Sequence, residues 1–266
     1  MRVGISVLTA VTALLLGGCA GTGNTTPASS GNATSPLGAL AVGQCTDAID
    51  AQQVPSFSVV ECDTAHAWEV ATIVPAPGDA YPGEAALRAV ADTGCASALS
   101  DYVGVDPVNT TFGVTFIAPI AAHWADPANR KVACLVGAAS GGITGTLKGT
   151  GYSFPTKGQC FATPPENSFS LDLVRCSESH AYEVYATKKL DGKTAPTTAE
   201  FDKAYTDTCV KGFKDFVGVD VGKSTYEIVH FILPKTQWTK LSDHRLVCSA
   251  GSPSGGVTGT LKDAKK

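Results

Sequence analysis

The chain has 266 residues, of which 44% are apolar and 17% are charged, and its formal net charge is −4. This composition is typical of one or two globular domains with hydrophobic cores and excludes a disordered or coiled-coil protein. A mildly acidic balance gives no support to nucleic-acid binding, which needs a clustered basic face, so no nucleic-acid partner is expected.

The first residues have the features of a secretory leader. Arg2 precedes an apolar run from Val3 to Leu16, and this run is shorter than the roughly twenty residues that a membrane-spanning helix needs. Leu16-Gly17-Gly18-Cys19 resembles the bacterial lipobox, in which the cysteine is lipidated and becomes the mature N-terminus. We therefore expect a signal peptide at residues 1–18 and a lipid anchor on Cys19. An ordinary cleaved signal with an incidental Cys19 is the alternative.

Residues 19–39 are expected to be the lipidated cysteine and a flexible tether. Between Ala20 and Gly38 the chain is almost entirely Gly, Ala, Ser, Thr, Asn and Pro and carries no charge. Such a segment cannot bury enough apolar surface to fold. Together with the anchor, it places the folded part at the extracytoplasmic face of the cell membrane.

From Leu40 onward the sequence repeats itself with a period of about 114 residues. The period is far too long for a solenoid unit, so the repeat predicts two domains, at 40–150 and 151–266. The matched positions include two runs, Cys62 to Val70 with Cys176 to Val184 and Gly141 to Lys148 with Gly255 to Lys262.

Each copy is predicted to be an α+β domain in which one helix packs on an antiparallel sheet, in the order β-β-α-β-β. Runs rich in Val, Ile and Thr predict the strands, and a short Gly/Thr-rich strand is expected to close each copy. In the first copy these runs are 57–62, 68–75, 112–119 and 131–136, and in the second the last two are 226–234 and 246–249. Apolar residues spaced by 4, 4, 4 and 3 mark one face of the helix, at Leu87, Ala91, Cys95, Leu99 and Tyr102 and at Phe201, Tyr205, Cys209, Phe213 and Phe216.

Eight cysteines at matched spacing predict two disulfides in each copy, because an exported chain folds in an oxidising space. The pairing that we favour is Cys45–Cys62 with Cys95–Cys134, and Cys160–Cys176 with Cys209–Cys248. Four cysteines allow two other pairings. A metal site is not expected, since no C-x2-C pair is present.

Both copies contain the pattern H-x-x-E, at His66 and Glu69 and at His180 and Glu183. In a strand, residues three apart point to opposite faces, so each His is expected to lie apart from its Glu. We favour a structural histidine that hydrogen-bonds the turn containing the cysteine. Contact with a metal or ligand, and catalysis, are the alternatives.

Trp124 and Trp238 are expected to be core side chains, with an exposed aromatic that grips a glycan or a partner as the alternative. Arg130 and Arg245 belong to the cationic pairs before the last cysteine of each copy. These pairs are expected either to meet a carboxylate such as Glu69 or Glu183 or to be solvated.

No nucleophile, phosphate-binding or metalloprotease motif is present, so we expect no catalytic residue, no cofactor and no enzyme activity. The copies differ in charge. Residues 40–150 hold 4 Lys and Arg against 11 Asp and Glu (4 − 11 = −7), and residues 151–266 hold 15 against 13 (15 − 13 = +2). This difference suggests that the copies bind different things or that the acidic copy faces the basic one.

The motifs resemble the septum formation domain of secreted and lipid-anchored actinobacterial envelope proteins. The resemblance rests on Gly-x-Cys, on Val-x-Cys-x3-His-x2-Glu-Val, on Tyr81 to Glu84, and on a Trp followed by a basic residue and a strand Cys. The second copy lacks the Tyr-Pro-Gly-Glu segment, and neither copy keeps the family's Gly-Asp-Arg after the Trp. The matched positions are Cys45, Cys62, His66, Glu69, Cys95, Trp124, Arg130 and Cys134, with Cys160, Cys176, His180, Glu183, Cys209, Trp238 and Cys248.

The resemblance implies a part in cell division and no known chemistry. We therefore expect a non-enzymatic envelope lipoprotein that acts as a binding or scaffolding module, with a protein or cell-wall partner. The alternative is an extracytoplasmic small-ligand or metal-binding protein, or a hydrolase, that uses the repeated His and Glu.

Overall fold

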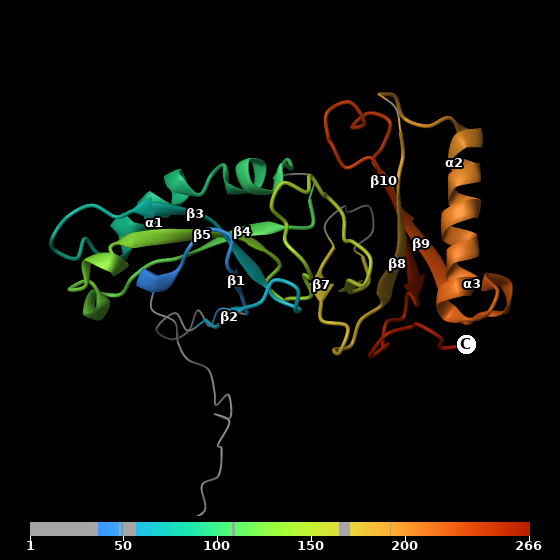
Figure 1. The fold of residues 1–266 in the computed structure, drawn as a ribbon, viewed down its shortest axis with the longest axis horizontal. Coiled ribbons are helices and arrows are strands. Elements are labelled where there is room, and N and C mark those ends of the chain that lie inside the picture. Colours follow the sequence, from blue (N-terminus) through green and yellow to red (C-terminus); the bar gives the residue numbers. More distant parts are fainter. Residues whose placement is uncertain (1–36, 48, 50–56, 108–109, 165–170, 192) are drawn as a thin grey trace, which may run out of the picture. The chain divides into compact units, whose positions relative to one another are not determined.

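Each half of the chain forms a five-stranded antiparallel sheet. The computed structural model describes residues 37–47, 49, 57–107, 110–164, 171–191 and 193–266 (Figure 1). The strand order is β2-β1-β3-β5-β4 in the first half and β7-β6-β8-β10-β9 in the second. Strands at equivalent places in the two sheets occupy equivalent places in the two sequence copies, so the halves share one topology.

The strands include two that the sequence analysis missed. The first half has β1 (Cys45–Thr46), β2 (Val59–Val60), β3 (Trp68–Pro75), β4 (Gly113–Ile117) and β5 (Lys131–Gly137). The second half has β6 (Cys160–Phe161), β7 (Leu173–Val174), β8 (Tyr182–Lys189), β9 (Glu227–Phe231) and β10 (Arg245–Gly251). The missed strands, β1 and β6, have two residues each, which is too short to produce a recognisable alternation. The order in each half is therefore β-β-β-α-β-β.

The strand expected at the end of each half does not form. Ile143 and Val257 make only isolated bridges, to His66 and His180. The glycines beside them have backbone angles that break a strand, since φ is +81° at Gly141 and +84° at Gly142.

The helices are short, and sheet dominates both halves, so the α+β expectation is met only in part. The α-helices are α1 (Glu84–Gly94), α2 (Thr198–Tyr205) and α3 (Lys211–Val217). Single π-helical turns follow α1 and α2, at Leu99–Val103 and Thr206–Val210. Short 3-10 helices lie at Leu37–Ala39, Ala121–His123, Pro127–Asn129 and Val221–Lys223.

The π-helical turns have a cause in the sequence. Apolar residues spaced four apart drift around an ideal α-helix, which has 3.6 residues per turn. One wider turn corrects that drift and returns the later residues to the sheet side. From the π-helical turns onward the apolar positions are buried: Leu99 and Tyr102 are 2% and 6% exposed, and Cys209 and Phe213 have no exposed surface.

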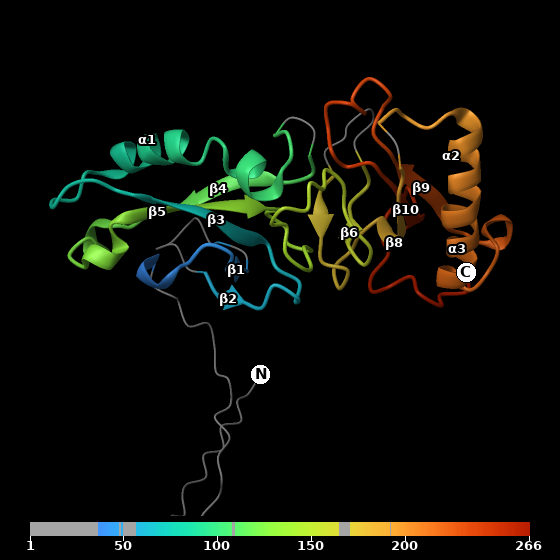
Figure 2. The same cartoon turned by 45° about the horizontal axis from the view of Figure 1, so that its top comes forward.

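Both faces of the first sheet are covered. Figure 2 shows α1 on one side of β3 and β5. The helix approaches the sheet so closely that a Cβ at Gly94 would lie 2.6 Å from a methyl group of Val74. Leu37, Leu40 and Phe57 pack against Val70 and Leu135 in a second buried cluster. β4 lies at one edge of the sheet, where it pairs with β5 alone among the described strands.

None of the helices in the described part of the chain is long and apolar enough to cross a membrane. The expected signal peptide and Cys19 lie outside the described residues.

Candidate functional site

The eight cysteines of the two halves form four disulfides. They join Cys45 to Cys62, Cys95 to Cys134, Cys160 to Cys176 and Cys209 to Cys248. This is the pairing favoured from the sequence. In each half, one bridge fastens the first strand to the turn before the histidine, and the other fastens the helical segment to the last long strand, β5 or β10.

His66 holds the turn that follows Cys62. Its Nδ1 donates to the carbonyl oxygen of Thr64 at 2.9 Å, while its backbone exchanges hydrogen bonds with Ile143 at 2.9 and 3.1 Å. The side chain is fully buried. His66 thus joins the cysteine turn to the end of the first half.

Glu69, on β3, binds the closing segment of the first half. Its carboxylate accepts hydrogen bonds from the backbone N–H of Leu147 at 2.6 Å, from the Thr146 hydroxyl at 2.9 Å and from the Tyr102 hydroxyl at 3.0 Å. Glu69 has no exposed surface. The repeated H-x-x-E motif and the repeated Gly-Thr-Leu-Lys segment are therefore the two sides of one buried contact.

The second half repeats this contact with one difference. Glu183 accepts from the N–H of Leu261 at 2.7 Å and from the Thr260 hydroxyl at 2.9 Å. Phe216 stands where Tyr102 stands in the first half, so the hydroxyl donor is missing there. The Nε2 of His180 is buried and has no hydrogen-bond partner among the described residues.

The expected separation of His66 from Glu69 is wrong. The Nε2 of His66 lies 3.4 Å from Oε1 of Glu69. His66 sits two residues before β3 begins, in an isolated bridge, so the alternation of a continuous strand does not apply to it.

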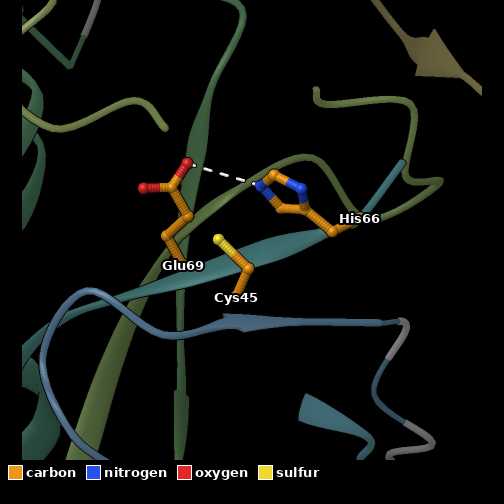
Figure 3. Close-up of side chains that lie close together, drawn as sticks. All are labelled: Cys45, His66 and Glu69. Atoms are coloured by element: carbon orange, nitrogen blue, oxygen red, sulfur yellow. Dashed lines mark hydrogen bonds and ion pairs between the residues drawn. The ribbon is translucent and has the colours of Figure 1, made fainter. Parts of the chain in front are cut away.

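Cys45, His66 and Glu69 present ligand-type atoms within 4.8 Å of one another (Figure 3). A cysteine binds a metal as a thiolate, and Cys45 is engaged in the disulfide with Cys62. The oxidised cluster therefore does not fit a metal ion. Its groups instead satisfy one another and the backbone inside the core.

The substitution Tyr102→Phe tests the Glu69 contact by removing a single hydrogen-bond donor. Burial, and then the negative charge of Glu69, raise the pKa of Tyr102 to about 12, so the hydroxyl keeps its proton and donates. We expect Tyr102→Phe to lower the free energy of unfolding by about 1.5–3 kcal/mol, the range for one hydrogen bond to a charged group. Urea denaturation of the oxidised chain measures this. An unchanged midpoint would contradict the contact, because Phe216 shows that the ring alone fits the fold.

Trp124 is a core side chain, 4% exposed. Its indole N–H donates to the Asp79 carbonyl at 3.1 Å, and its ring meets Tyr81 edge to face at 5.7 Å. Arg130 donates to the Trp124 carbonyl at 3.1 Å and pairs with the Asp79 carboxylate at 2.9 Å. The first copy's arginine therefore binds Asp79 rather than Glu69.

Trp238 is also buried, at 1% exposure, and stacks on His244 with ring centres 4.4 Å apart. His244 thus takes the place of Arg130 beside the tryptophan. Arg245 does something else. It pairs with Asp243 at 2.6 Å and donates to the Phe154 carbonyl at 2.7 Å, so it fixes the segment that enters the second half. Asp243 was not singled out from the sequence, because two of its partners, the backbone N–H groups of Ser153 and Phe154, lie 90 and 89 residues away along the chain.

A groove of about 680 Å³ lies beside β4 and α1 in the first half. Trp68, Tyr81 and Phe116 contribute rings to its lining, and Glu84 and Arg88 contribute charges. The Arg88 guanidinium lies 5.5 Å from the centre of the Phe116 ring. The sequence signal for this site was the Tyr81–Glu84 segment, which the second copy lacks.

In the second half, aromatic side chains replace two smaller aliphatic side chains at the equivalent place. Phe201 replaces Leu87 and Tyr205 replaces Ala91. Both contact His230, which stands in place of Phe116, at ring-centre distances of 5.4 and 5.2 Å. Burial lowers the pKa of His230 below its ordinary value, which favours the neutral ring between these aromatics.

Residues 42–248 match the family model described as septum formation. The chain belongs to the septum formation family. No curated protein and no solved structure matches the chain. The match runs from the first disulfide to the last, so it spans both sheets of this septum formation protein.

Proposed function

We propose that this septum formation protein is a non-enzymatic envelope lipoprotein that acts as a binding or scaffolding module at the septum. Lipid on Cys19 would anchor it to the extracytoplasmic face of the cell membrane. Its partner would be an envelope protein or a cell-wall component. The family supports the link to the septum, and the Leu-Gly-Gly-Cys sequence supports the anchor.

The observation that carries the non-enzymatic part is the burial of the repeated motif. His66 and Glu69 have no exposed surface, and His180 and Glu183 are 2% and 5% exposed. All four side chains hydrogen-bond to the chain itself, and Glu69 and Glu183 hold the closing segments. A hydrolase or ligand-binding site would need these groups open to a substrate, which argues against the alternative use of the motif.

Cell fractionation and microscopy test this proposal together. We expect a fluorescent fusion to concentrate at division septa and to remain with the membrane fraction, and depletion to disturb septation. Cys19→Ser should release the protein from the membrane, because the acylated thiol is lost. Ser29→Ala, in the tether, is the matched control and should stay bound.

A diffuse distribution together with normal septa after depletion would overturn the septal role. Retention of Cys19→Ser in the membrane fraction would overturn the lipid anchor.

A further inference from the structure

We propose that the groove beside β4 receives an extended apolar segment with basic flanks from a partner protein, and that this segment adds to the first sheet as a further strand. The inference rests on the proposed function as a binding module and names the surface that does the binding.

The first argument is the free edge of β4. Within the described part of the chain this strand pairs with β5 on one side only. An unpaired edge presents a row of backbone N–H and C=O groups that can pair with a strand of another chain. Val114, on the same strand, is 40% exposed, which is unusual for a large apolar side chain in this protein. A partner strand would cover it.

The second argument is the shape of the groove. Thr115 and Phe116 are neighbours in β4 and pair with neighbouring residues of β5, so their side chains point to opposite faces of the sheet. Both line the groove. The groove therefore runs along the edge of the strand rather than over one face.

An added strand would place its alternate side chains on the two sides of that edge. On one side they would meet Tyr81, Leu87 and Phe116, and on the other Ile49 and Trp68, all of which line the groove. These walls are apolar or aromatic, so they select apolar residues in the bound segment.

The third argument is charge. Residues 40–150 hold 4 basic against 11 acidic residues, a net −7 (4 − 11), and Glu84 is exposed in the groove wall. Arg88, the cation of the groove, already faces the Phe116 ring. Lysine or arginine beside the apolar core of a bound segment would therefore be attracted to this half.

The second half makes a natural comparison. Its edge strand β9 carries His230 at the position that corresponds to Phe116. His230 packs against Phe201 and Tyr205. Its net charge is +2, from 15 basic and 13 acidic residues. We therefore assign the peptide site to the first half.

The test begins with a random decapeptide library displayed on phage and selected on the full mature chain, purified oxidised with its anchor in detergent. Enriched peptides should alternate apolar residues and carry Lys or Arg at an end. Each is then synthesised, and its Kd is measured by fluorescence anisotropy. Enrichment of sequences without apolar alternation would overturn the proposal.

Two matched variants of α1 locate the site. Ala85 is exposed and lines the groove, whereas the next residue, Ala86, is exposed and does not line it. Ala85→Trp should raise the Kd about tenfold or more, as the loss of a central interface position does, and Ala86→Trp should change it less than about twofold. Equal effects of the two variants would overturn the site.

Backbone methylation tests the strand. Successive N–H groups of a strand point to opposite edges, so two forms of one peptide are made with N-methyl groups on alternate residues. One form should lose binding about tenfold or more and the other should keep it, because only one edge faces β4. Equal binding by the two forms would overturn strand addition.

The remaining outcomes separate this inference from the proposed function. A wild-type dimer that Ala85→Trp dissociates would make a second copy of the chain the occupant and overturn the partner segment. If no peptide is found whose binding depends on the groove, and septal localisation is retained, this inference alone is overturned. A groove-dependent peptide with diffuse localisation supports it and overturns the septal role instead.

Discussion

Replacing Glu69 with alanine should lower the free energy of unfolding of the first half by about 3–5 kcal/mol, the range for breaking a buried charged network. The carboxylate has no exposed surface and accepts from Leu147, Thr146 and Tyr102. Alanine leaves the buried Leu147 amide and Tyr102 hydroxyl without an acceptor and opens a small cavity. The urea midpoint of the oxidised chain measures the loss, and hydrogen exchange at the Leu147 amide reports it locally.

The second half supplies the control for this experiment. Glu183→Ala should destabilise its own half through Leu261 and Thr260, while leaving exchange at the Leu147 amide unchanged. Glu69→Gln should cost less than Glu69→Ala, since the amide keeps one acceptor oxygen. If Glu69→Ala were as stable as the wild type, the carboxylate would not hold the closing segment.

Removing the Cys95–Cys134 disulfide should have an effect of similar size. The bridge joins residues 39 apart, and the chain-entropy model gives about 4 kcal/mol for a loop of that length. The change is Cys95→Ala with Cys134→Ala, which leaves no unpaired thiol in the half. The urea midpoint of the double variant, compared with the wild type, measures the loss.

The shorter bridge is the internal control. Cys45 and Cys62 are 17 residues apart, for which the same model gives about 3 kcal/mol. Cys45→Ala with Cys62→Ala should therefore cost somewhat less. A variant without the Cys95–Cys134 bridge that unfolds at the wild-type midpoint would show that packing alone holds the helix against β5.

The strands, helix and disulfides that were predicted correctly are those that short stretches of the sequence determine. The long β-branched runs gave β3 and β5, the spacing of apolar residues from Leu87 onward gave α1, and equal cysteine spacing gave the disulfides. Strands of two residues, such as β1, leave no pattern. The π-helical turn could be inferred only by noticing that spacings of four exceed the period of an α-helix.

The candidate sites were harder to predict because their partners lie far apart along the chain. The H-x-x-E motif and the Gly-Thr-Leu-Lys segment were both visible as repeats, yet nothing local shows that Glu69 binds Leu147. The groove lies in the first half, which lacks the aromatic rings that Phe201 and Tyr205 contribute at the equivalent positions of the second half. A position-by-position comparison of the two copies would have revealed this difference.

The contact between Glu69 and the closing segment also constrains the order in which the protein can fold. Glu69 and its partners Thr146 and Leu147 are 77 and 78 residues apart, and Glu183 and its partners are separated in the same way. A chain that is synthesised N-terminus first exposes each carboxylate long before the donors arrive. Neither half can therefore close until its last residues have emerged. Because such distant contacts form slowly, each half spends that interval with apolar surface exposed to aggregation.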